Sequence, residues 1–268
     1  MMGRVLICAG SDSGGGAGIQ ADIKAVTALG AFAMTAVTAL TAQNTLGVQG
    51  VQGVPPEFIR LQMQSVLEDL GVDALKTGML HDTATIDAVC DEIAARAPGV
   101  PLVADPVMVA TAGNRLLAAE AVETLRRRLL PMATVITPNI PEAEELTGLT
   151  IADEPAMHAA CAALLAMGAR AVLLKGGHMT GETLVDLLAT PLATHRYADP
   201  RIATRQTHGT GCTLASALAA GLAQGLALEP AVRRARAYVR AAILAAPGYG
   251  AGHGPLNHAV TVEAGRFG

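Results

Sequence analysis

The chain has 268 residues, 51% of them hydrophobic but only 2% aromatic, and its formal net charge is −4. A chain of this composition can bury a large core, and its apolar runs are too short to span a bilayer. Because it offers neither a basic surface nor aromatic stacking platforms, nucleic acid is excluded as the expected partner and a small-molecule ligand is favoured.

Four cysteines stand far apart, without the paired spacing of a zinc site or a disulfide framework: Cys8, Cys90, Cys161 and Cys212. The first residues indicate a strand and not a signal peptide. No polar linker or low-complexity tract divides the chain. We therefore expect a cytoplasmic protein with reduced thiols, folded as one domain over residues 1–268.

Hydrophobic periodicity predicts strands that alternate with helices. In the first half we expect strands at 5–9, 74–77 and 102–104 and helices at 19–29, 55–70 and 83–95. A glycine loop at 10–18 precedes the first helix, and a second apolar run follows it at 33–42. In the second half we expect a helix at 118–129, a strand at 134–136, a helix near Glu142, a helix at 154–167, a strand at 171–174, a hairpin or sheet edge from 183–189 and 194–197, and a helix at 214–226.

This alternation predicts the α/β class, with a mostly parallel sheet covered by helices on both faces. Ligands of such folds collect at the carboxyl ends of the strands. Candidate functional residues follow the predicted strands at those ends: Asp12, Gln43, Met79, Asp105, Asn139 and Lys175. We therefore expect one ligand site at that edge of the sheet.

The segment Thr-His-Gly-Thr-Gly-Cys-Thr at 207–213 leads directly into the last predicted helix. Gly209 and Gly211 let backbone N–H groups converge where a helix N-terminus carries partial positive charge, so the turn favours an anion such as a phosphoryl group in transfer. Cys212 falls in the first helical turn, where the same field favours thiolate over thiol. The alternative is a small buried helix residue.

The glycine-rich segment at 14–19 lacks the third glycine of the dinucleotide fingerprint, and no glycine loop ends in the Gly-Lys-Ser/Thr of a P-loop. A tight turn between strand and helix explains this segment at least as well as a ligand cradle does. A bound nucleotide must be held in another way.

Two acidic residues are candidates for a Mg²⁺ site. Glu142 lies in the first turn of its predicted helix, three residues after Asn139, and its carboxylate could hold the waters of a Mg²⁺ that bridges phosphates. It could also simply complement the helix dipole. Asp105 ends a strand, where Pro106 keeps it extended toward the ligand crevice; a capping role is the alternative.

Lys175 ends an apolar strand and is one of only three lysines in the chain. A compact ammonium there suits a migrating phosphate, and an exposed strand end is the alternative.

The amide of Gln43 could pair with the edge of a heterocycle by donating and accepting at once. Because aromatic residues are so few, Met, Val or Leu must hold such a ring.

The histidines lack the short paired spacing of metal ligands. We interpret four of them as surface or loop residues: His178, His208, His253 and His258. Of these, His208 is of particular interest because it lies inside the anion loop.

Motifs occur over nearly the whole chain, in an order and at spacings far more specific than any one of them alone. They are Ala-Gly-Ser-Asp-Ser-Gly-Gly-Gly-Ala-Gly-Ile-Gln-Ala-Asp (9–22), Ala-Gln-Asn-Thr (42–45), Lys-Thr-Gly-Met-Leu (76–80), Asp-Pro-Val-Met (105–108), Thr-Pro-Asn-Ile-Pro-Glu (137–142), Leu-Lys-Gly-Gly-His (174–178), the anion loop (207–213) and Gly-His-Gly-Pro-Leu-Asn-His (252–258). In these segments the chain closely resembles the bacterial hydroxymethylpyrimidine/phosphomethylpyrimidine kinases of thiamine biosynthesis, within the ribokinase-like superfamily.

The resemblance implies a single-domain, three-layer α/β/α fold and ATP-dependent phosphorylation of 4-amino-5-hydroxymethyl-2-methylpyrimidine, and then of its monophosphate to the pyrophosphate. It implies substrate contacts from five residues: Gln43, Asp22, Gly10, Met79 and Val107. It implies an anion hole at 209–212 that includes Thr210 and Gly211, with Cys212 as the base. Lys175 and Asn139 would contact ATP, Asp105 and Glu142 would surround Mg²⁺, and the assembly would be a homodimer.

Two other functions remain open. A pyridoxal or pyridoxine kinase acts on a substrate that also presents a hydroxymethyl group on a six-membered nitrogen heterocycle. A non-catalytic sensor of a nucleotide or vitamin precursor could keep the fold without the chemistry, although intact Lys175, Glu142 and Cys212 argue against it.

Sugar kinases of the wider superfamily carry an Asp base where this chain has Cys212, and the pyrimidine-kinase branch shares the cysteine.

Overall fold

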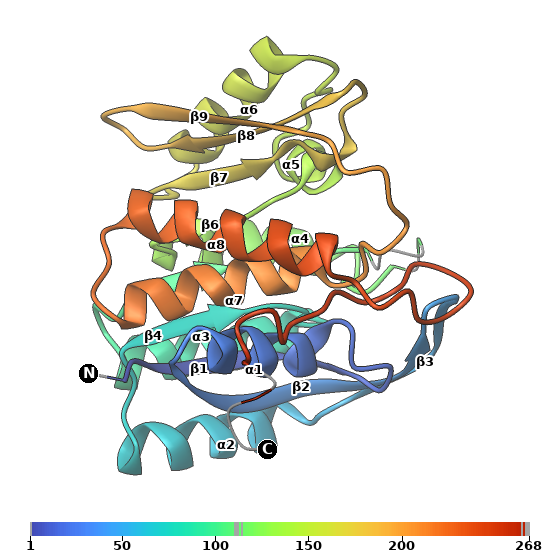
Figure 1. Ribbon diagram of the computed structural model, residues 1–268. Helices are drawn as coiled ribbons and strands as arrows, with labels where there is room; N and C mark the ends of the chain where they lie inside the picture. Colours follow the sequence, from blue (N-terminus) through green and yellow to red (C-terminus); the bar gives the residue numbers. More distant parts are fainter. Residues whose placement is uncertain (1, 110–112, 114, 264, 266–268) are drawn as a thin grey trace.

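The computed structural model describes residues 2–109, 113, 115–263 and 265. Nine strands form one sheet in the order β3-β2-β1-β4-β5-β6-β7-β8-β9 (Figure 1). In chain order the strands are β1 (Arg4–Asp12), β2 (Phe32–Asn44), β3 (Gly47–Gly53), β4 (Ala74–Thr77), β5 (Leu102–Ala104), β6 (Val135–Ile136), β7 (Val172–Lys175), β8 (Thr183–Ala189) and β9 (Thr194–Pro200).

The central strands, from β2 through β1, β4, β5 and β6 to β7, pair in parallel. Antiparallel pairs close both edges: β3 lies beside β2 at one edge, and β8 and β9 follow β7 at the other. The predicted α/β fold with a mostly parallel sheet is therefore confirmed, as is the hairpin at the sheet edge. Since parallel strands share a direction, their carboxyl ends all meet at one edge.

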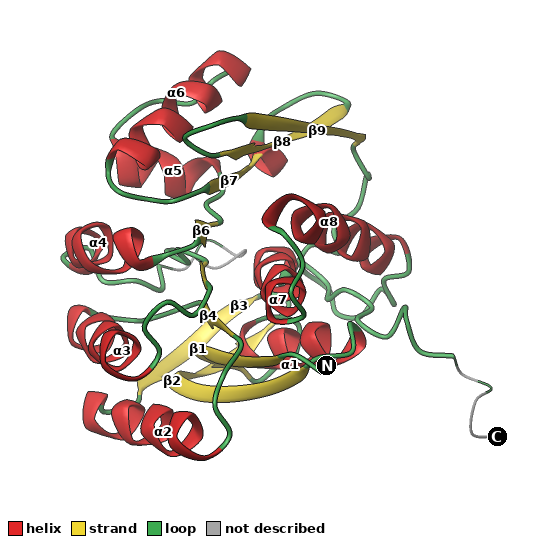
Figure 2. Ribbon diagram, turned by 90° about the vertical axis from the view of Figure 1, so that its left-hand side faces the viewer, coloured by secondary structure: helices red, strands yellow, loops and turns green. Residues whose placement is uncertain are grey.

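Helices cover both faces of the sheet (Figure 2). They are α1 (Gly18–Ala28), α2 (Pro56–Asp69), α3 (Thr83–Arg96), α4 (Ala121–Thr124), α5 (Ile140–Thr147), α6 (Glu154–Ala166), α7 (Thr210–Ala223) and α8 (Leu228–Leu244). One apolar core packs α1, α7 and α8 against the sheet, and the other packs α2 to α6 against the opposite face. This arrangement is the three-layer α/β/α architecture that the resemblance implied.

The strand β1 shows why its sequence is continuously apolar. Leu6 and Cys8 point into the core under α2 and α3, while Val5, Ile7 and Ala9 point into the core under α1 and α7. Successive side chains of a strand alternate between faces, and both faces of this sheet are covered, which explains why residues 5–9 are apolar at every position.

Four details differ from the sequence-based expectation. The strand β1 continues to Asp12, so residues 10–12 belong to it and not to the glycine loop. The glycine-rich edge strand β3 and the helix α8 were not predicted. The helix expected at 118–129 begins at Ala121, and after α4 its second half, Leu125–Leu129, has π-helical geometry. In the described part of the chain, no helix has the length and apolar character needed to cross a membrane.

Candidate active site

A cavity of about 660 Å³ opens where the carboxyl ends of the parallel strands meet the start of α7. Twelve of the thirteen predicted site residues line it: Gly10, Gln43, Met79, Asp105, Val107, Asn139, Glu142, Lys175, Gly209, Thr210, Gly211 and Cys212. Residues separated by up to 202 positions along the chain, from Gly10 to Cys212, are thus brought to one site. The structure thus brings the predicted residues together at the carboxyl edge of the sheet.

The loop before α7 leaves backbone donors facing this cavity. Gly209 precedes the helix with φ 82°, and a Cβ at this position would lie 1.9 Å from the carbonyl oxygen of Gly16, so the position requires glycine. Within the described residues, the N–H groups of Gly211 and Cys212 have no hydrogen-bond partner in the chain. Two free donors at a helix N-terminus make this loop a suitable binding place for an anion.

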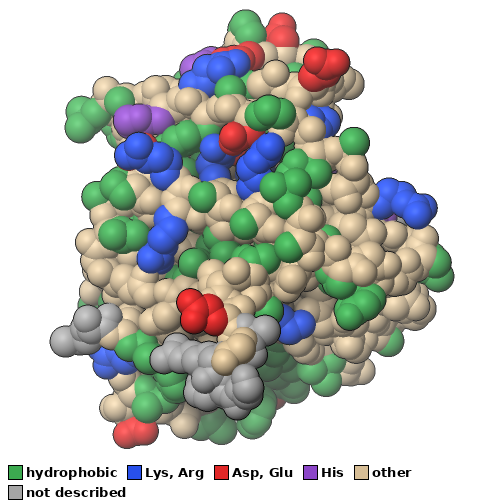
Figure 3. Space-filling view, in the orientation of Figure 1, with side chains coloured by type: hydrophobic (Ala, Val, Ile, Leu, Met, Phe, Trp, Pro, Cys, Tyr) green, Lys and Arg blue, Asp and Glu red, His purple; other side chains and the backbone are tan. Residues whose placement is uncertain are grey.

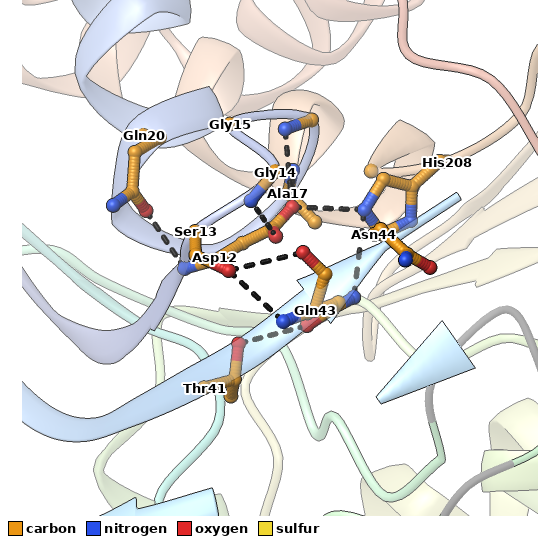
Figure 4. A network of polar contacts seen from close by, with 12 residues as sticks. Asp12, Ser13, Gly14, Gly15, Ala17, Gln20, Thr41, Gln43, Asn44 and His208 are labelled. Atoms are coloured by element: carbon orange, nitrogen blue, oxygen red, sulfur yellow. Dashed lines mark hydrogen bonds and ion pairs between the residues drawn. The ribbon is translucent and has the colours of Figure 1, made fainter. Parts of the chain in front are cut away.

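The first glycine loop is organised differently, because its donors are already used. The carboxylate of Asp12 accepts hydrogen bonds from the N–H groups of Gly14, Gly16 and Ala17 at 2.8, 3.0 and 2.8 Å (Figure 4). Burial would raise the pKa of Asp12, but these bonds and the adjacent His208 hold it below its usual value. The segment is a tight turn around a carboxylate and not a phosphate cradle.

His208 joins the two loops. Its Nε2 lies 2.8 Å from Oδ2 of Asp12 and 3.5 Å from Nε2 of Gln43, and the ring is buried (Figure 4). His258 is also buried, with its Nε2 2.9 Å from the hydroxyl of Thr213. Both histidines lie in loops, as predicted, but they are buried and not at the surface, whereas His178 and His253 are exposed.

Lys175 is not an exposed strand end. Its Nζ lies 3.0 Å from Oδ1 of Asp105 and 4.0 Å from Oε2 of Glu142, and only 14% of its side chain is exposed. Asp105 is the N-cap of none of the helices that the structure describes, and it also accepts a hydrogen bond from the hydroxyl of Thr137 at 2.9 Å. Burial opposes the charged form of Lys175, but the two carboxylates raise its pKa above the usual value.

Glu142 combines the two roles considered from the sequence. Its carboxylate accepts the backbone N–H of Asn139, whose side chain accepts the N–H of Glu142 in return, so the pair forms a capping box at the start of α5. Its carboxylate also lines the cavity. Burial raises the pKa of Glu142 to about 7, against the attraction of Lys175.

The charges around Lys175 fit a divalent cation. Two buried carboxylates, Asp105 and Glu142, share one ammonium group, so this corner carries an excess of negative charge when Glu142 is ionised. The described residues contain no group of three or more His, Cys, Asp or Glu side chains placed to hold a metal ion. These donors therefore suit a Mg²⁺ ion that keeps most of its water and phosphate ligands.

Cys212 lies in the first turn of α7, as predicted, but its expected ionisation is wrong. Although the helix N-terminus favours a thiolate, burial raises the pKa of the thiol to about 12. The side chain is half-buried. In the protein without substrate, Cys212 is a thiol at neutral pH.

Asp22 lies behind the cavity wall and not on it. Its side chain is completely buried, with one carboxylate oxygen 2.8 Å from Nζ of Lys76 and the other 2.6 Å from the hydroxyl of Ser216. Lys76, which the sequence reasoning did not single out, lines the cavity in its place. A lysine inside the short apolar strand at 74–77 was the available signal.

The far end of the cavity lies between the β8–β9 hairpin and α8. Ile202, Val239 and Ile243 supply apolar lining there, and Arg236 lies 2.8 Å from Asp186 and 2.9 Å from Asp199. Figure 3 shows basic side chains gathered over this part of the surface, with acidic groups among them. Sequence reasoning did not find this end, because its residues come from α8 and from the loop after β9.

Comparisons with known proteins show the family to which this chain is similar. Residues 12–257 match the family described as phosphomethylpyrimidine kinase. The chain is 52% identical over 261 residues to a thiamine biosynthesis bifunctional protein, ThiED, of Geobacter sulfurreducens; the match covers 97% of this chain but only 53% of that protein. It is 50% identical to a hydroxymethylpyrimidine/phosphomethylpyrimidine kinase of Streptomyces coelicolor, over 95% of this chain and 93% of the other. An ADP complex of Bacillus subtilis pyridoxal kinase has a TM-score of 0.90 and 35% identity, covering 97% of this chain and 98% of that one.

Proposed function

The chain belongs to the phosphomethylpyrimidine kinase family, and on this premise we propose that it transfers the γ-phosphate of ATP to 4-amino-5-hydroxymethyl-2-methylpyrimidine and then to the resulting monophosphate. The observation that carries the proposal is the convergence of two free N–H groups, from Gly211 and Cys212, with the ammonium of Lys175 on one cavity. A phosphoryl group in transfer needs such fixed donors and positive charge.

The pyrimidine ring is assigned to the end of the cavity lined by Gly10, Gln43, Met79 and Val107. Gly10 leaves room for the Met79 side chain, since a Cβ on it would lie 3.0 Å from the Met79 sulfur. Gln43 offers an amide for the edge of the ring, and a hydrogen bond of 3.1 Å from Thr41 to its Oε1 holds this side chain (Figure 4). Aliphatic and thioether side chains then supply the faces that aromatic rings supply in other proteins.

The nucleotide is assigned to the opposite end, with its phosphates reaching the anion loop. Lys175 and Asn139 contact these phosphates, while Thr210, Gly211 and the rest of the loop enclose the group that moves. Cys212 takes the proton of the attacking hydroxyl. In a loose transition state this proton leaves late, so positioning and charge contribute more than early deprotonation. Asp22 acts through Lys76 and not by touching the substrate.

Mg²⁺ is the metal cofactor we assign to this chain. Asp105 and Glu142 would hold it through water molecules and phosphate oxygens, near Asn139. When bound, such an ion neutralises charge on the phosphates and orients them for transfer. The chain's own contribution is the unbalanced pair of carboxylates beside Lys175.

We also propose that residues 1–268 act as one kinase domain in the cytoplasm, and as a homodimer. One sheet includes every described strand, and the four cysteines are free. Exposed apolar side chains on β2, β3 and α2 supply a surface for a second copy: Leu40, Val51, Phe58 and Leu61.

The deciding experiment measures ADP release from ATP and Mg²⁺ with the pyrimidine alcohol, and then with its monophosphate, by a coupled assay. We expect turnover with both acceptors and none without an acceptor. Absence of turnover together with tight binding of nucleotide and alcohol would overturn the proposal in favour of a sensor.

Pyridoxal kinase activity is the second candidate, because the Bacillus subtilis pyridoxal kinase aligns over nearly the whole chain. Competing pyridoxal and the pyrimidine alcohol at equal concentration gives the ratio of their kcat/KM values, which is the measure of specificity. We expect the pyrimidine to be preferred, and preference for pyridoxal would reverse the substrate assignment.

A further inference from the structure

A completely buried ion pair lies beneath the cavity floor. Lys76 of β4 and Asp22 of α1 meet at 2.8 Å, and neither side chain has any exposed surface. Desolvating two charges costs several kcal/mol per ion, and apolar residues of the same size are often at least as stabilising. The cost of this pair points to a role beyond holding the fold together.

The pair is tied to α7, the helix that carries Cys212. Ser216 donates a hydrogen bond of 2.6 Å to Asp22, and Ser216 lies four residues after Cys212 on α7, so both side chains share one face of the helix. Gly78 leaves space for the ammonium group, because a Cβ there would lie 2.7 Å from Nζ of Lys76. Lys76 and Cys212 line the same cavity.

The sulfur of Cys212 receives support from several elements. The backbone N–H of Gly18, the first residue of α1, helps to lower the pKa of the thiol, and the sulfur itself lies at the start of α7. The charged groups that face this region are Lys76 from β4, Asp22 from α1, Asp105 after β5 and Lys175 from β7. Burial raises the pKa of the thiol, Asp22 and Asp105 add to that increase, and the positive charge of Lys76 is the largest influence that lowers it.

We propose that Lys76 is a positioning residue whose ammonium group, held by Asp22, is the counter-charge that stabilises the thiolate form of Cys212. When the thiol ionises, its proton passes to solvent, and the sulfur anion is left beside Lys76. A hydroxyl group that later gives its proton to this sulfur converts the thiolate back to the thiol. The catalytic meaning of this arrangement rests on the proposed kinase function, but the electrostatic arrangement itself does not.

The test measures the rate at which iodoacetamide alkylates Cys212, at a fixed, mildly alkaline pH and without ATP or pyrimidine. Only the thiolate reacts, and Cys8, Cys90 and Cys161 are buried, so mass spectrometry of the labelled peptide follows one site. The variant Cys212→Ser gives the background.

The two members of the pair should change this rate in opposite directions. Lys76→Met removes the counter-charge and should slow alkylation about tenfold or more, the size expected for loss of a neighbouring opposite charge. Asp22→Asn leaves the ammonium uncompensated and should accelerate alkylation several-fold. A purely structural pair would move both rates in the same direction, by loosening the site.

Lys24→Met is the matched control, because Lys24 is an exposed lysine whose ammonium group donates to the carbonyl of Gly15. It should leave the rate unchanged. If Lys76→Met does not fold, the charge-neutral double variant Lys76→Met/Asp22→Asn replaces it, and a smaller loss, of a few-fold, is expected because the opposing charge of Asp22 is removed as well. Unchanged rates in folded variants, or equal shifts of the same sign, would overturn the proposal. Because no substrate is present, that outcome is separate from failure of the kinase function.

Discussion

Nε2 of His208 lies 2.8 Å from Oδ2 of Asp12, and this buried pair joins the two glycine loops of the site. On one side, Asp12 gathers the N–H groups of the turn after β1 (Figure 4). On the other side, His208 leads directly into Gly209, which packs on the backbone of Gly16. The position of the anion loop therefore depends on a carboxylate almost two hundred residues earlier in the chain.

Asp12→Asn should disturb both loops at once. The amide cannot accept from three backbone N–H groups and from His208 with the same geometry, so at least one buried donor loses its partner. We expect unfolding in urea to show a loss of about 3 kcal/mol, in the range for a broken buried pair, and kcat/KM to fall at least tenfold. Ser13→Ala is the control, because Ser13 is exposed and its hydroxyl contacts only the backbone of Gln43; it should change neither quantity much.

Gly209→Ala tests the contact between the loops. Gly209 has φ 82° and would place a Cβ 1.9 Å from a backbone oxygen, whereas Gly225 has φ 83° and open space around it. Gly225→Ala should thus lose about 1 to 2 kcal/mol from backbone strain alone. Gly209→Ala should lose more and should also abolish phosphoryl transfer, because the loop must move. Equal losses of stability in the two variants, with activity retained, would show that the close approach to Gly16 is unimportant.

Much of this arrangement could be predicted from the sequence, because parallel strands carry the residues at their carboxyl ends to one edge. The apolar runs ending near Asp105, Asn139 and Lys175 were sufficient to place these side chains together. The roles of Lys76 and His208 could not be predicted, since each depends on a partner that lies far away in sequence. Cys212 shows the same limit: the helix N-terminus was visible in the sequence, but the burial that outweighs it was not.

Lys175→Met should lower kcat by about 10²-fold or more while changing the KM for the pyrimidine little, because the ammonium stabilises charge that is present in the transferring group. It also leaves Asp105 and Glu142 buried without their shared cation. Steady-state kinetics at saturating ATP and Mg²⁺ measure the effect. Lys24→Met, the exposed lysine, should behave as the unmodified protein, and a Lys175→Met enzyme with normal kcat would exclude this lysine from the transfer step.

Glu142→Gln should change how stability depends on pH. The pKa of Glu142 is raised from 4.5 to about 7 in the folded chain, so between these values the folded state binds more protons than the unfolded state. Stability from this group is therefore present below pH 4.5 and is lost as the pH rises toward 7. Gln keeps an oxygen that can accept the N–H of Asn139, so it should preserve the cap while removing this loss.

Urea titrations from acid to neutral pH, without nucleotide or Mg²⁺, measure this difference. The stability of Glu142→Gln relative to the unmodified chain should rise across the interval, and the variant should need more Mg²⁺ for the same activity. Glu123→Gln, at a mostly exposed position on α4, is the control and should show no such trend. A constant difference at every pH would mean that Glu142 titrates normally.

Cys212→Ala should reduce kcat by roughly 10²-fold, the usual size for a lost general base. The thiol has a pKa of about 12 in the free protein, so its ionised fraction at neutral pH is small, and most of the barrier must be lowered by the loop donors and Lys175. Cys212→Ala removes the sulfur but keeps the backbone N–H, which separates these two contributions. If its kcat stays near that of the unmodified chain while Lys175→Met loses activity, the sulfur has no part in proton transfer. In that case the loop acts through its backbone alone.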